Sequence, residues 1–261
     1  MTPPNHVKPQ AYALLASQMP VIETPNGLLH AAVAIAMHTM ENIDPNEVDR
    51  SLQDITDQIR QRLRSNEHQA LLAHAHQVLF EEYGFAGNTD HYYEPQNSYI
   101  PIVLETRTGI PITLTLIYKI VLERLGLCVH GLNTPGHFLA RVEVKGNPMI
   151  IDPFCRGQMR SREETFELIE KMIGQATNRS PLLMQHVIIP RWLRLEIIMH
   201  AITHRERRSL VLWLAEDPRT QSYEQARDLV DELLAQDWNL SLIHISEPTR
   251  PRLISYAVFC L

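Results

Sequence analysis

The chain has 261 residues, of which 44% are hydrophobic and 21% are charged, and its formal net charge is −6 at pH 7. This composition is typical of a soluble globular protein with enough apolar material for one large domain or two small ones. The acidic balance argues against nucleic acid as the main partner, and no apolar run of about 18 residues predicts a membrane-spanning helix. Three cysteines without a CxxC pair indicate neither a disulfide framework nor a zinc site. The N-terminus has no signal-peptide layout, so we expect a cytoplasmic protein without a cofactor or metal.

The N-terminal region, residues 1–84, is predicted to be helical after a polar, proline-rich arm. Pro45 follows Asp44, an order that is typical of a helix with an aspartate N-cap and a proline at its first position. The next apolar residues recur at three- and four-residue spacing, which is the period of an amphipathic helix. They are Val48, Leu52, Ile55, Ile59 and Leu63. A further helix is predicted over residues 67–80.

A loop, a short helix and one long helix are predicted next. Residues 86–98 are rich in turn-forming side chains. Residues 98–105 are expected to form a short helix in which Tyr99 packs inward. The long helix covers residues 111–125, because its apolar residues fall on one helical face. Gly126 then supplies the glycine that commonly ends a helix.

A small antiparallel sheet is predicted after the long helix. An early strand is expected at residues 129–132. In the next strand, residues 137–144, side chains alternate between two faces, so that His137 and Arg141 share one of them. A Lys-Gly-Asn turn leads into a return strand, which ends at Asp152.

The rest of the chain divides into a helical region and a tail that we exclude from the fold. Residues 161–239 are predicted to be helical, and two helices at 191–214 and 223–234 resemble one tetratricopeptide-type unit. Residues 240–261 can be translated back into DNA that resembles the two constant parts of a transposase-type sequencing adapter, in order and with the right gap between them. They are therefore treated like a cloning remnant, and the natural chain is expected to continue past Asn239.

The block RTGIPITLTLIYKIVLERLGLCVHGLNTPGHFLARVEVKGNPMIIDPF resembles the core of the transglutaminase-like superfamily. The specific elements are GIPITL at the start of the long helix, RLGL at its end, PGHF, and IIDPF. More closely, the block resembles the SirB-type bacterial family, which joins such a core to a helical, tetratricopeptide-like C-terminus. The resemblance covers residues 85–160 well. It implies a mostly helical α+β fold with a papain-type core of one central helix packed on a small antiparallel sheet.

The resemblance also implies a site. In active relatives a cysteine starts the central helix, where the helix dipole favours the thiolate. A histidine on the next strand pairs with the thiol, and an aspartate on the following strand orients the histidine. His137 and Asp152 match the histidine and the aspartate. The cysteine position falls on Pro111, which suits the first turn of a helix but offers no nucleophile. The SirB-type family generally lacks this cysteine as well.

The first functional interpretation is a non-catalytic transglutaminase-like module, a pseudoenzyme whose cleft binds a protein or peptide. In this interpretation His137 and Asp152 remain as a structural hydrogen-bonded pair. The partner is expected to be neither a nucleic acid nor a membrane. The residues expected to line the cleft are Pro111, Thr113, Tyr99 and Arg141.

The second interpretation is a cysteine-type hydrolase or acyl transferase with a relocated nucleophile. It would use His137 and Asp152 together with Cys155, which lies three residues after Asp152. Cys128 lies at the far end of the central helix, away from the end that favours a thiolate. Thr113 has a hydroxyl near the helix start but no evident activating group. Packing or surface roles remain open for all three side chains.

Overall fold

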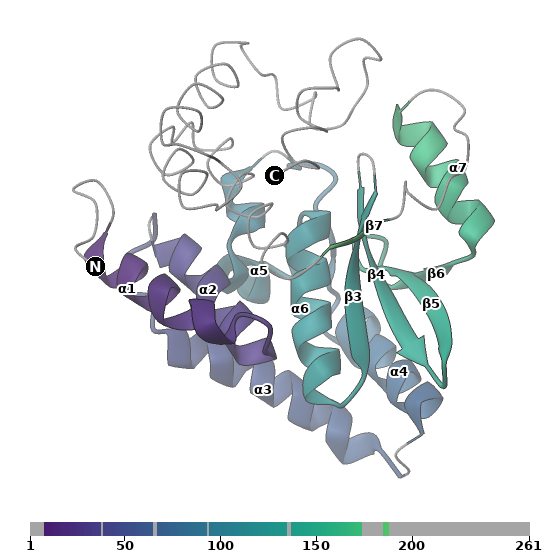
Figure 1. The fold of residues 1–261 in the computed structure, drawn as a ribbon, viewed down its shortest axis with the longest axis horizontal. Helices are drawn as coiled ribbons and strands as arrows, with labels where there is room; N and C mark the ends of the chain where they lie inside the picture. The colour runs from purple at the N-terminus through teal and green to yellow at the C-terminus, as the bar shows by residue number, and fades with distance from the viewer. Residues whose placement is uncertain are drawn as a thin grey trace.

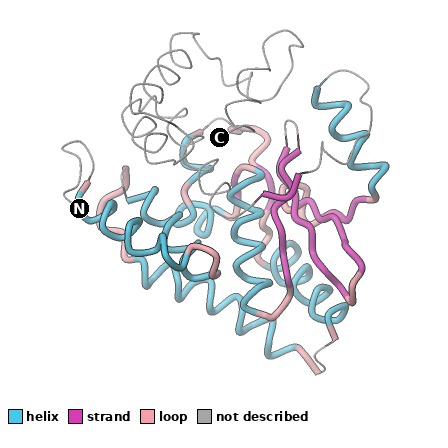
Figure 2. Tube along the Cα trace, viewed as in Figure 1, coloured by secondary structure: helices cyan, strands magenta, loops and turns pink. Residues whose placement is uncertain are grey.

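The computed structural model describes residues 8–173, apart from residues 38, 65–66, 93 and 135–136, together with residues 185–187. The predicted helices at 191–214 and 223–234 and the excluded tail at 240–261 lie outside the described residues. Figure 1 shows the central helix α6 between the N-terminal helices and the larger sheet. Figure 2 shows the same view by secondary structure, with the strands gathered on one side of the molecule.

The N-terminal region is helical, as its apolar periodicity predicts. The helix predicted over 67–80 is found as α4, which continues directly as one π-helical segment, Gln77–Glu82. A short 3₁₀ turn, Met19–Val21, follows the first helix. The four α-helices are α1 (Pro9–Gln18), α2 (Pro25–Met37), α3 (Pro45–Arg62) and α4 (His68–His76).

Helix α3 begins with the predicted N-cap. The Asp44 carboxylate accepts a hydrogen bond from the backbone N–H of Asn46 at 2.9 Å, and Pro45 occupies the first helical position. Replacing Asp44 by alanine is expected to lower the free energy of unfolding by about 1 kcal/mol, because that N–H loses its acceptor. Urea denaturation measures the loss. Asp44→Asn retains a capping oxygen and should cost much less, so equal losses for both variants would contradict the capping role.

The loop region before the central helix contains two short strands and two short helical segments. A 3₁₀ turn (Pro95–Ser98) precedes α5 (Ile100–Thr106), which covers most of the short helix predicted at 98–105. Strands β1 (Ala86–Gly87) and β2 (Thr108–Gly109) form a parallel pair. The pair joins the start of the segment predicted as a loop, residues 86–98, to the residues that directly precede α6.

The central helix α6 (Pro111–Arg124) is buried along almost its whole length, which corrects the prediction of a single apolar face. Every residue from Pro111 to Leu122 is buried, because α2 and α3 pack on one side and strands β3 and β4 on the other. The buried Lys119 remains satisfied, since its Nζ donates to the Val129 carbonyl at 2.6 Å and forms an ion pair with Glu123.

The larger sheet is antiparallel throughout, with the strand order β6-β5-β4-β3-β7. Its register pairs Val144 with Asn147, so the hairpin turn consists of Lys145 and Gly146 alone. Both residues have positive φ, as a two-residue type I′ turn requires. Helix α7 (Arg162–Ile173) follows β6. The strands are β3 (Cys128–Thr134), β4 (His137–Val144), β5 (Asn147–Asp152), β6 (Gln158–Arg160) and β7 (Gln185–Val187).

One hydrophobic cluster joins the N-terminal helices, α6 and the inner face of the sheet. It includes Leu52 and Ile59 of α3, Leu116 of α6 and Val142 of β4. The helices of the first 84 residues therefore belong to the core that supports the sheet. Among the described residues, no helix combines the length and apolarity that crossing a membrane requires.

Candidate functional site

The start of α6 lies beside the start of strand β4. The Thr115 hydroxyl in the second turn of the helix donates to the carbonyl oxygen of Phe138 at 3.4 Å. His137 is the first residue of β4, and Asp152 is the last residue of the neighbouring strand β5. Packing of α6 on β3 and β4 thus places His137 near the start of the helix, and the pairing of β5 with β4 brings Asp152 beside the histidine.

His137 and Asp152 are in direct contact. The Nε2 atom of His137 lies 2.9 Å from Oδ1 of Asp152. Asp152 is completely buried and His137 is 8% exposed. An ionised carboxylate can only accept hydrogen bonds, so Nε2 is the donor. The aspartate therefore holds the imidazole ring in one orientation.

Asp152 has further partners besides His137. Its Oδ2 accepts from Nε of Arg160 at 2.9 Å and lies 2.8 Å from Nη2 of the same guanidinium. Its Oδ1 also accepts from the backbone N–H of Cys155 at 3.2 Å. Burial acts to raise the pKa of Asp152, but hydrogen bonds and charges from His137 and Arg160 outweigh it and lower that pKa from 3.8 to about 2. The carboxylate therefore stays ionised and links two strands to the loop after β5.

An aromatic wall covers one side of the pair. The Phe154 ring meets the His137 ring edge to face at a centroid distance of 5.7 Å, and it meets the Tyr92 ring at 5.8 Å. The Phe154 carbonyl accepts from the backbone N–H of Gly87 at 2.8 Å. A Cβ atom at Gly87 would overlap the Phe154 ring, so only glycine admits this close approach.

Cys155 lies in the same loop as this network, but its environment disfavours the thiolate. Partial burial of the thiol and the charge of the Asp152 carboxylate raise the pKa of Cys155 above 9.0, and Arg160 offsets only part of this. Reactive cysteines instead occupy electropositive surroundings that lower the thiol pKa. The arrangement thus positions Cys155 close to Asp152 without activating it.

Of the residues expected to line the cleft, Pro111 lies at the start of α6 and Arg141 lies in the middle of β4. Pro111 is buried at the first position of α6, where Ile110 acts as N-cap without a side-chain hydrogen bond. Arg141 lies four residues along β4 from His137, about 13 Å away at the usual rise of a strand. Its guanidinium pairs with Glu143 at 2.6 Å.

The other two expected lining residues point elsewhere. Thr113 is fully buried, and its hydroxyl has no hydrogen-bond partner. At 100° per residue, it lies about 160° around α6 from Thr115, which faces β4. Tyr99 is buried, and its hydroxyl donates to Oγ1 of Thr39 at 3.1 Å, just beyond the end of α2. Neither residue is placed to act on His137.

Sequence reasoning missed Arg160 and Phe154 as parts of this network. A buried carboxylate needs a cation or several donors, so the arginine eight residues after Asp152 was the available signal for Arg160. Phe154 lies within the IIDPF motif, but its contact with Gly87 joins residues that are far apart in the sequence. Among the described residues, no group of three or more His, Cys, Asp or Glu side chains is arranged to hold a metal ion.

The central helix, the antiparallel sheet and the histidine–aspartate pair together define a mixed α+β protein of the transglutaminase-like class. The sequence profile of the transglutaminase-like superfamily matches residues 46–194. The match covers more than half of the chain, and the chain therefore belongs to this superfamily.

Two curated relatives are similar to about half of this chain. A UPF0162 protein of Xylella fastidiosa is 34% identical over 148 residues, which are 56% of this chain and 53% of the relative. A UPF0162 protein of Vibrio cholerae is 29% identical over 140 residues, which are 52% of this chain and 51% of the relative. The chain spans about half the length of these relatives.

A shorter segment of the chain is similar to a eukaryotic protein. F-box only protein 21 of mouse is 44% identical over 64 residues, which are 24% of this chain but only 10% of that protein. Part of the chain therefore resembles a segment of a much longer protein. No solved structure matches the chain.

Proposed function

We propose that this protein is a non-catalytic member of the transglutaminase-like superfamily and that it binds a protein or peptide partner. The C-terminal region, whose sequence predicts helices that resemble the tetratricopeptide-like part of SirB-type proteins, would add to the binding surface. The observation that carries the proposal is Pro111 at the start of α6. The position where a helix N-terminus would favour a thiolate holds a side chain without a nucleophile.

The network around Asp152 supports the same proposal. A carboxylate that serves only to orient a catalytic histidine needs no further partner, yet Asp152 also binds Arg160 and the backbone N–H of Cys155. These contacts hold the loop after β5 against the sheet. These contacts support a structural role for the retained pair.

The alternative function is a cysteine-type hydrolase or acyl transferase in which Cys155 replaces the missing nucleophile. It is favoured by one observation, the position of Cys155 in the loop that contacts the His137–Asp152 pair. It is disfavoured by the raised pKa of the thiol. A nucleophile of this type normally needs a lowered pKa or an adjacent base.

Thiol alkylation separates the two functions. We expect iodoacetamide to modify Cys155 no faster than it modifies N-acetylcysteine between about pH 6.5 and pH 9, because the neighbouring carboxylate suppresses the thiolate. Mass spectrometry of the Cys155 peptide gives the rate. The His137→Gln variant is the matched control. A faster rate in the native protein near neutral pH that disappears in His137→Gln would establish an activated thiol and overturn the non-catalytic proposal.

A further inference from the structure

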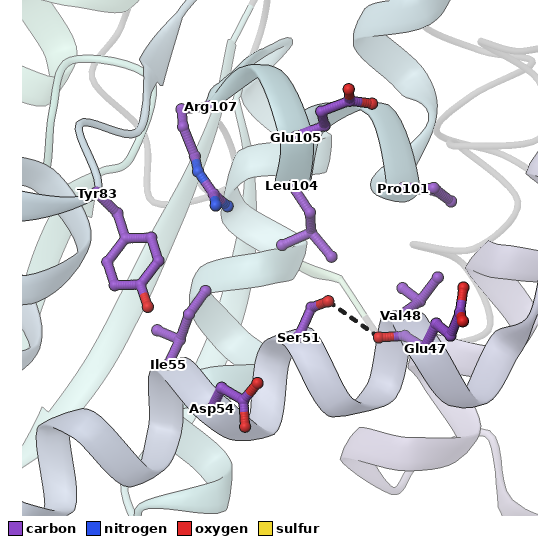
Figure 3. Close-up of a pocket in the computed structure, with 10 residues that line it drawn as sticks. All are labelled: Glu47, Val48, Ser51, Asp54, Ile55, Tyr83, Pro101, Leu104, Glu105 and Arg107. Carbon is purple, nitrogen blue, oxygen red and sulfur yellow. Dashed lines mark hydrogen bonds between the residues drawn. The ribbon is translucent and has the colours of Figure 1, made fainter.

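A pocket of about 390 Å³ lies between α3 and α5, bounded at one end by the segment that leads out of the π-helical turn. Figure 3 shows Val48 and Ile55 of α3 facing Leu104 of α5 across it. These three residues are buried apart from the surface they present to the pocket, so the floor is apolar. We call this pocket the α3–α5 slot. None of its lining residues belongs to the His137–Asp152 network.

The rim of the α3–α5 slot is acidic. Asp54 on α3 and Glu105 on α5 are exposed on its two walls, and Glu47 lies further along α3. Glu47 is 3.9 Å from Arg50. In the part of the chain that the structure describes, Asp54 and Glu105 form no ion pair, so their charges are available to a ligand. Three carboxylates oppose an anionic ligand such as a phosphate or a nucleotide.

Arg107 adds a different kind of contact at one end of the slot. Its guanidinium carbon lies 4.9 Å from the centroid of the Tyr83 ring and 5.2 Å from that of the Phe85 ring. Figure 3 shows the side chain reaching into the space between Tyr83 and Leu104. Within the described residues, the guanidinium has no carboxylate or carbonyl partner. Stacking on aromatic faces orients an arginine while its N–H groups remain free to donate.

These three features select one class of ligand. The acidic rim requires a cation, and the apolar floor requires an apolar group beside it. The Arg107 guanidinium requires a hydrogen-bond acceptor, because it can only donate. A protonated polyamine supplies the cation and apolar methylene groups, but it has no acceptor for the Arg107 guanidinium. A peptide that carries a lysine or arginine next to an apolar residue supplies all three, since its backbone carbonyl oxygens accept.

We propose that the α3–α5 slot binds an extended segment of a partner protein in which a basic residue adjoins an apolar one. The apolar side chain lies on the floor formed by Val48, Ile55 and Leu104. A basic side chain next to the apolar one lies at the acidic rim, against Asp54 on one wall or Glu105 on the other, and Arg107 donates to the peptide backbone. This inference does not depend on whether the His137–Asp152 pair is catalytic.

Fluorescence anisotropy with two labelled peptides, Gly-Lys-Leu-Lys-Gly and Gly-Glu-Leu-Glu-Gly, tests the proposal on the full chain. We expect saturable binding of the lysine peptide at low salt and none of the glutamate peptide. Asp54→Asn together with Glu105→Gln should weaken the lysine peptide by about fivefold or more, since each exposed pair contributes modestly. The matched control, Asp90→Asn with Glu163→Gln, removes the same charge outside the slot and should leave the affinity unchanged.

Three results would overturn the proposal: equal binding of the two peptides, no binding of the lysine peptide, or equal losses in the slot and control variants. The Arg107→Gln variant shows whether Arg107 donates to the peptide or only repels it. If Arg107 donates to the peptide, this variant weakens the lysine peptide, whereas a merely repulsive Arg107 would make the variant bind it more tightly. Unchanged melting temperatures of all variants show that the fold is intact.

Discussion

Replacing Asp152 by alanine is expected to lower the free energy of unfolding by about 3–5 kcal/mol, a large fraction of the stability of a domain. The carboxylate is completely buried, and its oxygens accept from His137, from Arg160 and from the backbone N–H of Cys155. Removing it leaves the Arg160 guanidinium without its buried counter-charge. Urea denaturation at pH 7 measures the loss.

Two further variants show which contact carries this effect. His137→Ala leaves the Asp152–Arg160 pair intact and should cost less than Asp152→Ala. The double variant with Asp152→Ala and Arg160→Met should be more stable than Asp152→Ala alone, since no unpaired charge remains. If Asp152→Ala leaves the melting temperature unchanged but abolishes an acyl-transfer activity, the pair is catalytic rather than structural.

The hydrogen-bond network of Asp152 also makes the unfolding free energy depend on pH in the acidic range. The pKa of Asp152 is about 2 in the folded protein and near 3.8 without the fold. A depressed folded-state pKa contributes stability above the unfolded value, and this contribution is lost as the pH falls from about 4 to about 2. The shift corresponds to about 2 kcal/mol. The unfolding free energy of the native protein should therefore fall more steeply over this range than that of Asp152→Asn.

Replacing Gly157 by alanine is expected to cost about 3 kcal/mol of stability. Gly157 has a φ of +72°, and a Cβ atom there would overlap the Phe80 ring. The left-handed conformation costs a non-glycine residue about 1–2 kcal/mol, and the overlap in a packed region adds about 1–3 kcal/mol. Chemical denaturation measures the sum.

Gly146→Ala is the matched control for this experiment. Gly146 has a similar φ of +79°, but no atom lies within 4 Å of the position that its Cβ would take. This variant should therefore lose only about 1–2 kcal/mol, the cost of the backbone conformation. Equal losses at both positions would show that Phe80 moves aside easily and that packing against it does not constrain the loop.

The Gly157 variant also bears on the candidate site. The backbone N–H of Gly157 donates to the Asp152 carbonyl at 2.9 Å, so this glycine closes the loop that begins at Asp152. Pushing the loop away from Phe80 is expected to loosen the contact between Asp152 and Arg160. Gly157→Ala should accordingly flatten the acid dependence of stability, as Asp152→Asn does.

The sequence by itself determined the elements whose causes are local. The capped start of α3 follows from Asp44 and Pro45, and the hairpin follows from the alternation after His137 and the turn at Gly146. The resemblance to the transglutaminase-like superfamily added the pairing of His137 with Asp152, two residues on neighbouring strands. Each of these features depends on residues close together in the chain or within one motif.

Only the tertiary structure decided the features that join distant segments. Burial of α6 on all sides depends on α2, α3 and the sheet packing around it. The α3–α5 slot and the stacking of Arg107 on Tyr83 likewise depend on helices that meet only in the folded chain. Even the Arg160–Asp152 pair needs strand β6 to bring the guanidinium back to the sheet. Periodicity reports which face of an element is apolar, whereas the identity of the neighbour on that face is set by how the elements pack.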